Sequence, residues 1–146
     1  MLTVSHNHRW RALVLATVYG SPAVATGNWV SIALSPEDPY YLNEIQHGLL
    51  RAAATGSVLF VAAALLAFYR LRLAVVAGLS ASVLSWPYFG YLAAELPWRV
   101  LGWLVRIHFN GAAQVTAVLS LAVATVYSLA EAWMVQTFRS TVGAKS

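Results

Sequence analysis

The sequence has no cysteine and very few charged residues. Without cysteine the chain can form no disulfide, thiolate metal site or cysteine nucleophile. Charged residues make up 10% of its 146 residues and hydrophobic residues 60%, whereas soluble domains carry about 25% charged residues. A soluble fold of this length could not bury so much apolar surface. The composition therefore excludes an ordinary soluble domain and favours one compact bundle in a membrane.

The apolar residues gather in four long segments. Each segment is close to the roughly 20 residues that a helix needs to cross the hydrocarbon core of a bilayer. We predict an all-α fold, an integral membrane four-helix bundle that forms one domain over residues 1–146. The predicted spans cover residues 12–34, 49–69, 73–94 and 112–135. The second helix is expected to start at Glu44, because Asn43 can cap it, and the short connection over 69–72 predicts an antiparallel hairpin of the second and third helices. Pro22 and Pro87 fall inside spans, where a missing backbone donor predicts kinks.

The segment between the third and fourth spans is too apolar for a simple loop. On a helical wheel Arg99, Arg106 and Asn110 fall on one face, while Trp98 and most of the leucines lie elsewhere. This pattern predicts a short amphipathic helix over residues 97–109 that lies on the membrane surface, with its tryptophans at headgroup depth. We interpret it as a lipid-anchoring elbow, with a lid over a ligand site as the alternative.

The basic residues predict the orientation. The net charge of +4 forms no patch suited to nucleic acid, because the basic residues flank the apolar segments. Six of them fall on one side and three on the other, so the positive-inside rule places both termini in the cytoplasm. We expect a bacterial cytoplasmic membrane. The six are Arg9, Arg11, Arg70, Arg72, Arg139 and Lys145, and the three are Arg51, Arg99 and Arg106.

Polar residues converge at the predicted outer ends of the helices. Glu44, His47 and Arg51 share one face of the second helix. Ionisable residues near the hydrocarbon are costly, so such a cluster is a candidate functional site. The first span adds Asn28 at the same end. We predict that His47, Arg51, Arg106 and His108 face one another across a shared cavity. The candidate ligand-binding residues are Glu44, His47, Arg51, Glu95, Arg106, His108, Asn110 and Gln114.

Three chemistries fit this cluster. Glu44 and His47 form an E-x-x-H pair that could hold a metal ion with Glu95 and His108, although the nearby arginines would repel a cation. His47 and His108 could instead be axial ligands of a haem. In the third hypothesis the arginines and histidines bind the head of a lipophilic molecule, with its tail among the residues Trp86, Tyr88, Phe89 and Tyr91. The structural alternative is that all these groups are caps, salt bridges and interface anchors.

Small residues predict where the helices pack. In the last span they recur at steps of three and four residues, and the second span has a similar line. The two lines are Ala113, Ala117, Ser120, Ala124, Ser128 and Glu131, and Ala53, Gly56, Ala63 and Ala67. We expect helix interfaces, within the chain or in a homo- or hetero-oligomer. Glu131 is expected to pair with Arg70 or Arg72.

The sequence thus favours a membrane protein that binds or acts on a lipophilic small molecule at the outer leaflet, with no catalytic residue assigned. The alternatives are a non-catalytic accessory or assembly subunit of a larger membrane complex and a haem-binding membrane subunit. The expected partners are the lipid bilayer and a lipophilic ligand, without nucleic acid. No metal-binding residue is assigned.

Overall fold

The chain is all-helical wherever its structure is described. The computed structural model describes the backbone of residues 2–34, 44–105 and 109–143, and the side chains of 9–31, 33–34, 45–91, 113–134, 136 and 143. Four helices follow one another, namely α1 (Leu2–Ala33), α2 (Glu44–Leu66), α3 (Leu71–Val105) and α4 (Phe109–Gly143). The predicted helical class is confirmed for these residues, as is the start of the second helix at Glu44.

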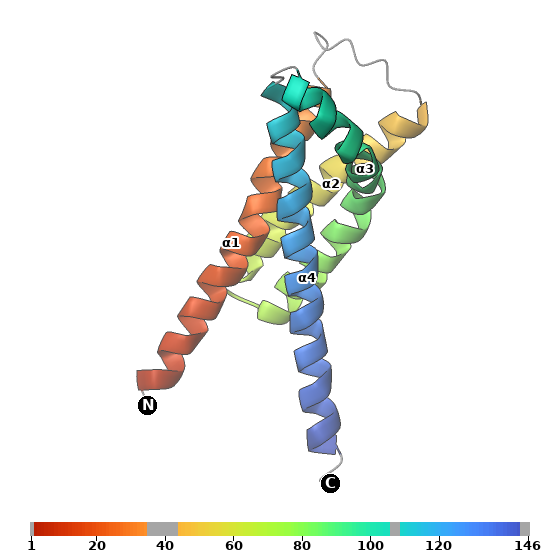
Figure 1. Cartoon of the computed structure of the whole chain (residues 1–146). Coiled ribbons are helices and arrows are strands. Elements are labelled where there is room, and N and C mark those ends of the chain that lie inside the picture. The colour runs from red at the N-terminus through yellow and green to blue at the C-terminus, as the bar shows by residue number, and fades with distance from the viewer. Residues whose placement is uncertain (1, 35–43, 106–108, 144–146) are drawn as a thin grey trace.

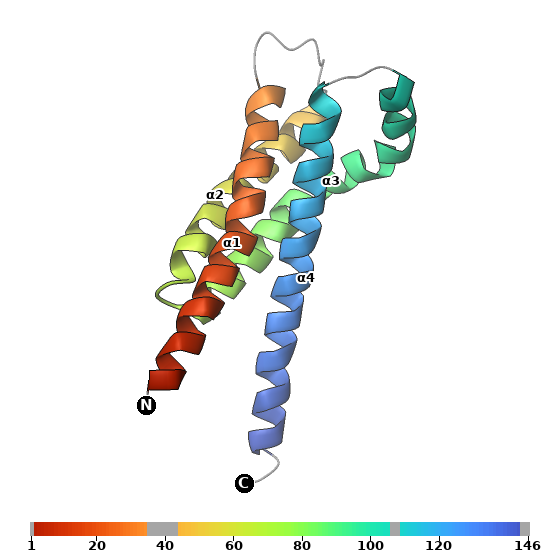
Figure 2. The same ribbon diagram turned by 60° about the vertical axis from the view of Figure 1, so that its left-hand side comes forward.

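The helices pack in a ring. α1 contacts α2 and α4, and α3 contacts the same two helices. α2 and α3 form the predicted antiparallel hairpin, which turns over residues 67–70. Backbone bonds from Tyr69 N (3.0 Å) and Arg70 N (2.7 Å) to the Leu66 carbonyl close this turn. Figures 1 and 2 place both chain ends at the end of the bundle toward which the hairpin turns.

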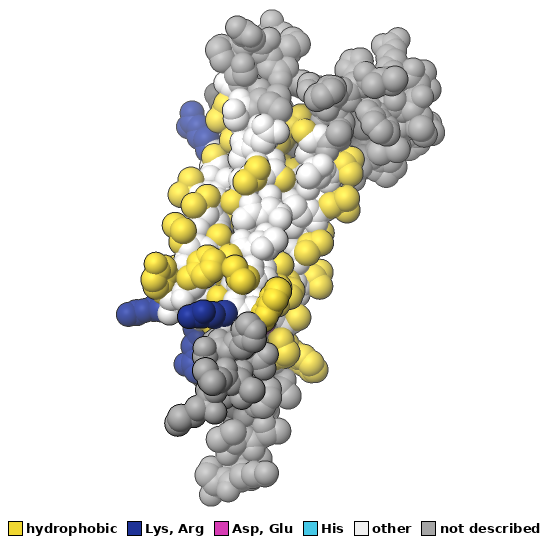
Figure 3. Space-filling view, turned by 90° about the vertical axis from the view of Figure 1, so that its left-hand side faces the viewer, with side chains coloured by type: hydrophobic (Ala, Val, Ile, Leu, Met, Phe, Trp, Pro, Cys, Tyr) yellow, Lys and Arg dark blue, Asp and Glu magenta, His cyan; other side chains and the backbone are white. Residues whose placement is uncertain are grey.

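Within the described residues, three helices are long and apolar enough to cross a membrane, over Ile45–Leu66, Leu71–Tyr91 and Ala113–Met134. Figure 3 shows apolar side chains on the outer surface of one face, with basic side chains near its lower end and again higher up. Apolar side chains exposed in this way need lipid around them. By length and composition, the chain is therefore an integral membrane protein.

The helix that contains the first predicted span, α1, is less hydrophobic than these three helices. α1 has 32 residues, enough to cross a bilayer, but it is not among the three apolar helices. Exposed Thr17, Ser21 and Asn28 contribute to the difference, and so do the buried residues Tyr19, Pro22 and Thr26.

The third helix is longer than predicted. Residues through Val105 continue α3 instead of forming a separate helix over 97–109, and residues 106–108 lie outside the described part. Figures 1 and 2 show that the ribbon of α3 changes direction in its second half. Pro87 and Pro97 lie in this half, and proline bends a helix when neighbouring groups take up the freed carbonyls. We predicted that the third span would end at residue 94 and that a separate helix would begin at residue 97, but α3 is continuous to Val105 and bends instead.

The predicted small-residue faces point into the bundle. Ala53, Ala63 and Ala124 are fully buried, so the two lines of small residues are used for packing inside the chain. Two glycines mark the closest approaches. An added Cβ at Gly56 would lie 2.9 Å from the Ala81 carbonyl of α3, and one at Gly78 would lie 2.3 Å from the Tyr19 ring of α1.

The orientation of the bundle can be tested directly because the chain has no cysteine of its own. A single cysteine replacing His6 should be protected from a membrane-impermeant thiol reagent on intact cells, and one replacing Tyr40 should be labelled. The physical reason is the excess of basic residues at the end that carries the termini. The cysteine-free parent gives the background. Labelling of His6→Cys alone would mean that the orientation is inverted.

Candidate functional site

The residues predicted to form the outer cluster lie at one end of the bundle. Glu44, His47 and Arg51 occupy the first two turns of α2, Glu95 lies in the second half of α3, and Asn110 and Gln114 lie in the first two turns of α4. The side chains of Glu44, Glu95 and Asn110, and the whole of Arg106 and His108, lie outside the described residues.

The described members of the cluster do not face one another. His47 and Arg51 are exposed on the outer side of α2, whereas Gln114 is buried inside the bundle with 3% of its surface exposed. Two of the four residues expected to share a cavity therefore point away from the bundle core. The predicted cavity of His47, Arg51, Arg106 and His108 stays a prediction, because its other half is not described.

Metal and haem ligation are not tested by this geometry. Among the described residues no three His, Asp or Glu side chains gather closely enough to hold a metal ion. The E-x-x-H pair includes Glu44, and both hypotheses include His108, so each depends on a side chain outside the described part. The structure does bear on the predicted site for the apolar tail of the ligand, because two of its four residues lie in the core. Tyr88 and Phe89 are core residues, and Tyr88 accepts a hydrogen bond of 3.0 Å from Trp29 Nε1.

The structure shows a different candidate site, a groove of about 780 Å³ between α1 and α4. Its walls mix small residues with hydroxyl and amide groups. They are Thr17, Gly20, Ser21, Val24, Ala25, Asn28, Ala113 and Thr116. Gly20 leaves the groove open, because nothing lies within 4 Å of the position that its Cβ would take. The groove lies at membrane depth, since Ala113 begins an apolar span.

The polar groups of this groove differ in how well they are satisfied. Thr17 donates to the Leu13 carbonyl and Ser21 to the Thr17 carbonyl, each at 2.9 Å. Asn28 is exposed, and its amide makes no hydrogen bond to any other described residue. A polar group that lacks a partner in the hydrocarbon layer costs free energy. The end of the groove that holds Asn28 therefore presents an amide that needs a partner.

Sequence reasoning noticed Asn28 but missed the groove. Thr17, Ser21 and Asn28 recur at steps of four and seven residues, which places them on one side of α1. That spacing was readable from the sequence. The sequence did not show whether this side of α1 faces the core or the lipid. The hydroxyl group of a serine or threonine can bond to its own helix, so the residue tolerates either environment.

Inside the bundle, polar side chains satisfy one another in pairs. Tyr19 Oη lies 2.8 Å from Ser128 Oγ, and Thr26 Oγ1 lies 2.7 Å from Ser57 Oγ. Trp86 Nε1 donates to Thr125 Oγ1 at 2.9 Å. These pairs join α1 to α4, α1 to α2 and α3 to α4. The first two pairs are buried and the third is partly buried. Because their members bond to each other, their role is to hold the helices in register.

The predicted pairing of Glu131 was wrong. Its carboxylate forms a salt bridge with Arg11 of α1 instead of with Arg70 or Arg72, and a second hydrogen bond from Arg11 Nε measures 3.3 Å. The hydrogen bond to Glu131 raises the pKa of the Arg11 guanidinium, although burial lowers it in part. Packing of α1 on α4 brings these ends together, whereas the turn that carries Arg70 and Arg72 joins α2 to α3.

No protein-family model, curated protein or solved structure matches this chain, so its function is argued from its own geometry.

Proposed function

We propose that the chain is a four-span membrane protein that binds an amphipathic small molecule in the groove between α1 and α4. The ligand's polar head meets Asn28 at the outer end, and its apolar chain follows α1 past Val24 toward Thr17. From Thr17 to Asn28 the helix rises by about 16 Å, at about 1.5 Å per residue. This length suits a lipid-like chain better than a compact solute.

The exposed amide of Asn28 carries this proposal. Its position beside Ala113, at the start of the α4 span, supports a place near one boundary of the hydrocarbon, which the predicted orientation makes the outer one. An alcohol or a primary or secondary amide head would satisfy both its donor and its acceptor. The open space at Gly20 then admits the chain that follows the head. Known ligand sites combine a mostly apolar wall with a few fixed polar groups in the same way.

The proposal also gives α1 and the other residues predicted for the site a position in the membrane. α1 crosses the membrane as the fourth span, because it packs against α2 and α4, which both cross. Asn110 and Gln114 lie within a turn of Ala113 and belong near the ligand head. His47 and Arg51 face outward on α2 and belong to the headgroup layer. The part of α3 beyond Tyr91 follows the outer membrane surface as the elbow.

A photoreactive probe tests the proposal. A long-chain alcohol that carries a diazirine should label α1 and α4 peptides around Val24 and Thr116 in the protein reconstituted in lipid nanodiscs. An excess of the unlabelled alcohol should compete. Gly20→Leu should reduce this labelling about tenfold, the equivalent of about 1.4 kcal/mol of binding free energy, because the new side chain fills the groove.

Gly48→Leu is the matched control. Gly48 is also a helical glycine with nothing within 4 Å of its Cβ position, but it lies on α2 and does not line the groove. It should keep full labelling. Asn28→Leu should weaken labelling without blocking the groove. Equal labelling of both glycine variants would contradict the proposal.

The accessory-subunit function stays as a second candidate because one observation favours it. The outward side of α1 carries the polar residues Thr17, Ser21 and Asn28 beside apolar ones such as Val24, whereas the outward sides of the spans in α2, α3 and α4 are mostly bulky and apolar, as at Val58, Val83 and Leu119. A helix of another protein would cover such a side better than lipid would. In that case Gly20→Leu should release a co-purifying membrane protein and leave probe labelling unchanged.

A further inference from the structure

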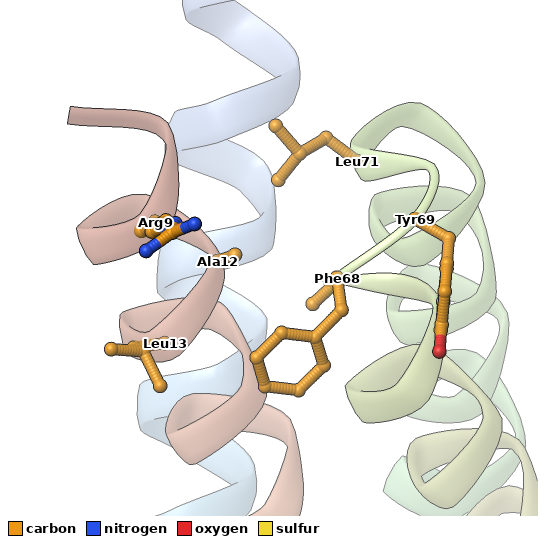
Figure 4. A pocket seen from close by; sticks show the side chains of 7 residues that line it. Arg9, Ala12, Leu13, Phe68, Tyr69 and Leu71 are labelled. Carbon is orange, nitrogen blue, oxygen red and sulfur yellow. The ribbon is translucent and has the colours of Figure 1, made fainter. Parts of the chain in front are cut away.

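A second pocket lies at the other end of the bundle, where the chain termini are. It has a volume of about 700 Å³ and separates the start of α1 from the turn between α2 and α3. Figure 4 shows the Phe68 ring between the two, with Arg9 on the α1 side and Leu71 beyond the turn. The lining residues are Arg9, Ala12, Leu13, Ala67, Phe68, Tyr69 and Leu71.

This pocket combines apolar walls with an excess of positive charge. Arg9 lines it, and Arg70 and Arg72 are exposed on either side of the lining residue Leu71. Glu131 is the one acidic side chain that the structure describes, and it is bound to Arg11. Within the described part, the other three guanidinium groups have no carboxylate partner. Figure 3 shows basic side chains near apolar ones at the lower end of the described surface.

The pocket lies at headgroup depth. The apolar span of α2 ends at Leu66 and that of α3 begins at Leu71, so the lining residues between them sit where the hydrocarbon ends. Phe68 and Tyr69 are exposed at this level, the depth at which aromatic side chains favour the interface. A molecule in the pocket therefore has its apolar part in the bilayer and its polar part in the headgroup layer.

The chemistry of the pocket selects one kind of occupant. Guanidinium groups bind phosphate through paired, charge-assisted hydrogen bonds. A soluble phosphate would leave the apolar walls of Leu13, Phe68 and Leu71 without a partner. A zwitterionic lipid carries its own cation, which the arginines repel. A phospholipid with net negative charge fits both the walls and the rim, and basic pockets between membrane helices bind such lipids.

We propose that the pocket between α1 and the α2–α3 turn binds an anionic phospholipid of the surrounding leaflet. Its phosphate meets Arg9, Arg70 and Arg72, and the start of one acyl chain lies against Leu13, Phe68 and Leu71. The bound lipid would fix the depth of this end of the bundle. The site is separate from the α1–α4 groove, with which it shares no lining residue, so either site can fail without the other.

Native mass spectrometry of the full chain tests this inference, with phosphatidylglycerol and phosphatidylcholine as the two probes. Phosphatidylglycerol should remain bound after detergent removal and phosphatidylcholine should not. Replacing any one of Arg9, Arg70 or Arg72 with Gln should weaken phosphatidylglycerol binding about fivefold, and the triple variant should abolish it. Leu13→Ser should also weaken binding, because it removes part of the acyl wall.

Arg51→Gln is the matched control, since Arg51 is an exposed arginine at the opposite end of the bundle. It should bind phosphatidylglycerol like the parent. Inorganic phosphate in excess should not displace the lipid, since it cannot use the apolar walls. The inference is overturned if the triple variant binds phosphatidylglycerol as the parent does, if phosphatidylcholine binds equally well, or if inorganic phosphate competes.

Discussion

Gly78→Ala is expected to lower the free energy of unfolding by about 1–3 kcal/mol, the range for overpacking a well-filled core. A Cβ at Gly78 would lie 2.3 Å from Cε1 and 2.5 Å from Cζ of Tyr19. The Tyr19 ring cannot move away cheaply, because it is fully buried, stacks on Phe60 and bonds to Ser128. Displacing it would break the link between α1 and α4. The measurement is the thermal unfolding midpoint in mild detergent.

Gly56→Ala should destabilise the protein by a similar amount at a second crossing. Its Cβ would lie 2.2 Å from Ser85 Oγ and 2.9 Å from the Ala81 carbonyl. The serine could rotate, but the backbone carbonyl could not, so α2 and α3 would have to separate. Removing the serine hydroxyl with Ser85→Ala should therefore rescue Gly56→Ala only in part.

Gly27→Ala is the control for both variants. Gly27 is also helical, but nothing lies within 4 Å of its Cβ position. Alanine is the better helix former by about 0.5–1 kcal/mol, so this variant should be as stable as the parent or slightly more stable. Equal midpoints for the alanine variants of Gly78 and Gly27 would contradict the close approach of the Tyr19 side chain of α1 to Gly78 of α3.

Helical class was predictable because composition and segment length decide it. An apolar segment such as 49–69 is best interpreted as a membrane helix, since lipid cannot form hydrogen bonds with unpaired backbone N–H and C=O groups. The buried faces were also readable where small residues repeat, as from Ala53 to Ala67. Boundaries were harder. The pattern of residues 97–109 suggested a separate amphipathic helix, but α3 bends and continues to Val105, as a helix can at proline.

The candidate site was less predictable because it depends on which way side chains point. His47 and Arg51 share a face of α2, as predicted, but that face is the exposed one. Periodicity shows that residues share a side, not whether that side meets lipid or protein. The same ambiguity hid the α1–α4 groove, whose hydroxyl residues resemble those of the core. The partner of Glu131 depended on the packing of α1 against α4, which no local pattern encodes.

Arg11→Met should be the most damaging change at the charged end of the bundle, and clearly more damaging than Glu131→Gln. The two partners differ in exposure, since 46% of the Arg11 side chain is accessible and only 6% of the Glu131 side chain. Removing Arg11 leaves a buried carboxylate without its partner, which should cost about 3 kcal/mol, the lower end of the range for broken buried pairs. Removing the charge of Glu131 leaves an arginine that can reach water or lipid phosphates.

Unfolding midpoints of a double-mutant cycle would measure this asymmetry. Glu131→Gln should cost below about 1 kcal/mol, as for a solvated ion pair, and the double variant Arg11→Met with Glu131→Gln should recover most of the loss caused by Arg11→Met. Arg70→Met serves as the control, because Arg70 has an equal charge at the same end but does not contact Glu131. Should Arg70→Met cost as much as Arg11→Met, Glu131 would be paired with the hairpin turn, and the packing of α1 on α4 described above would be wrong.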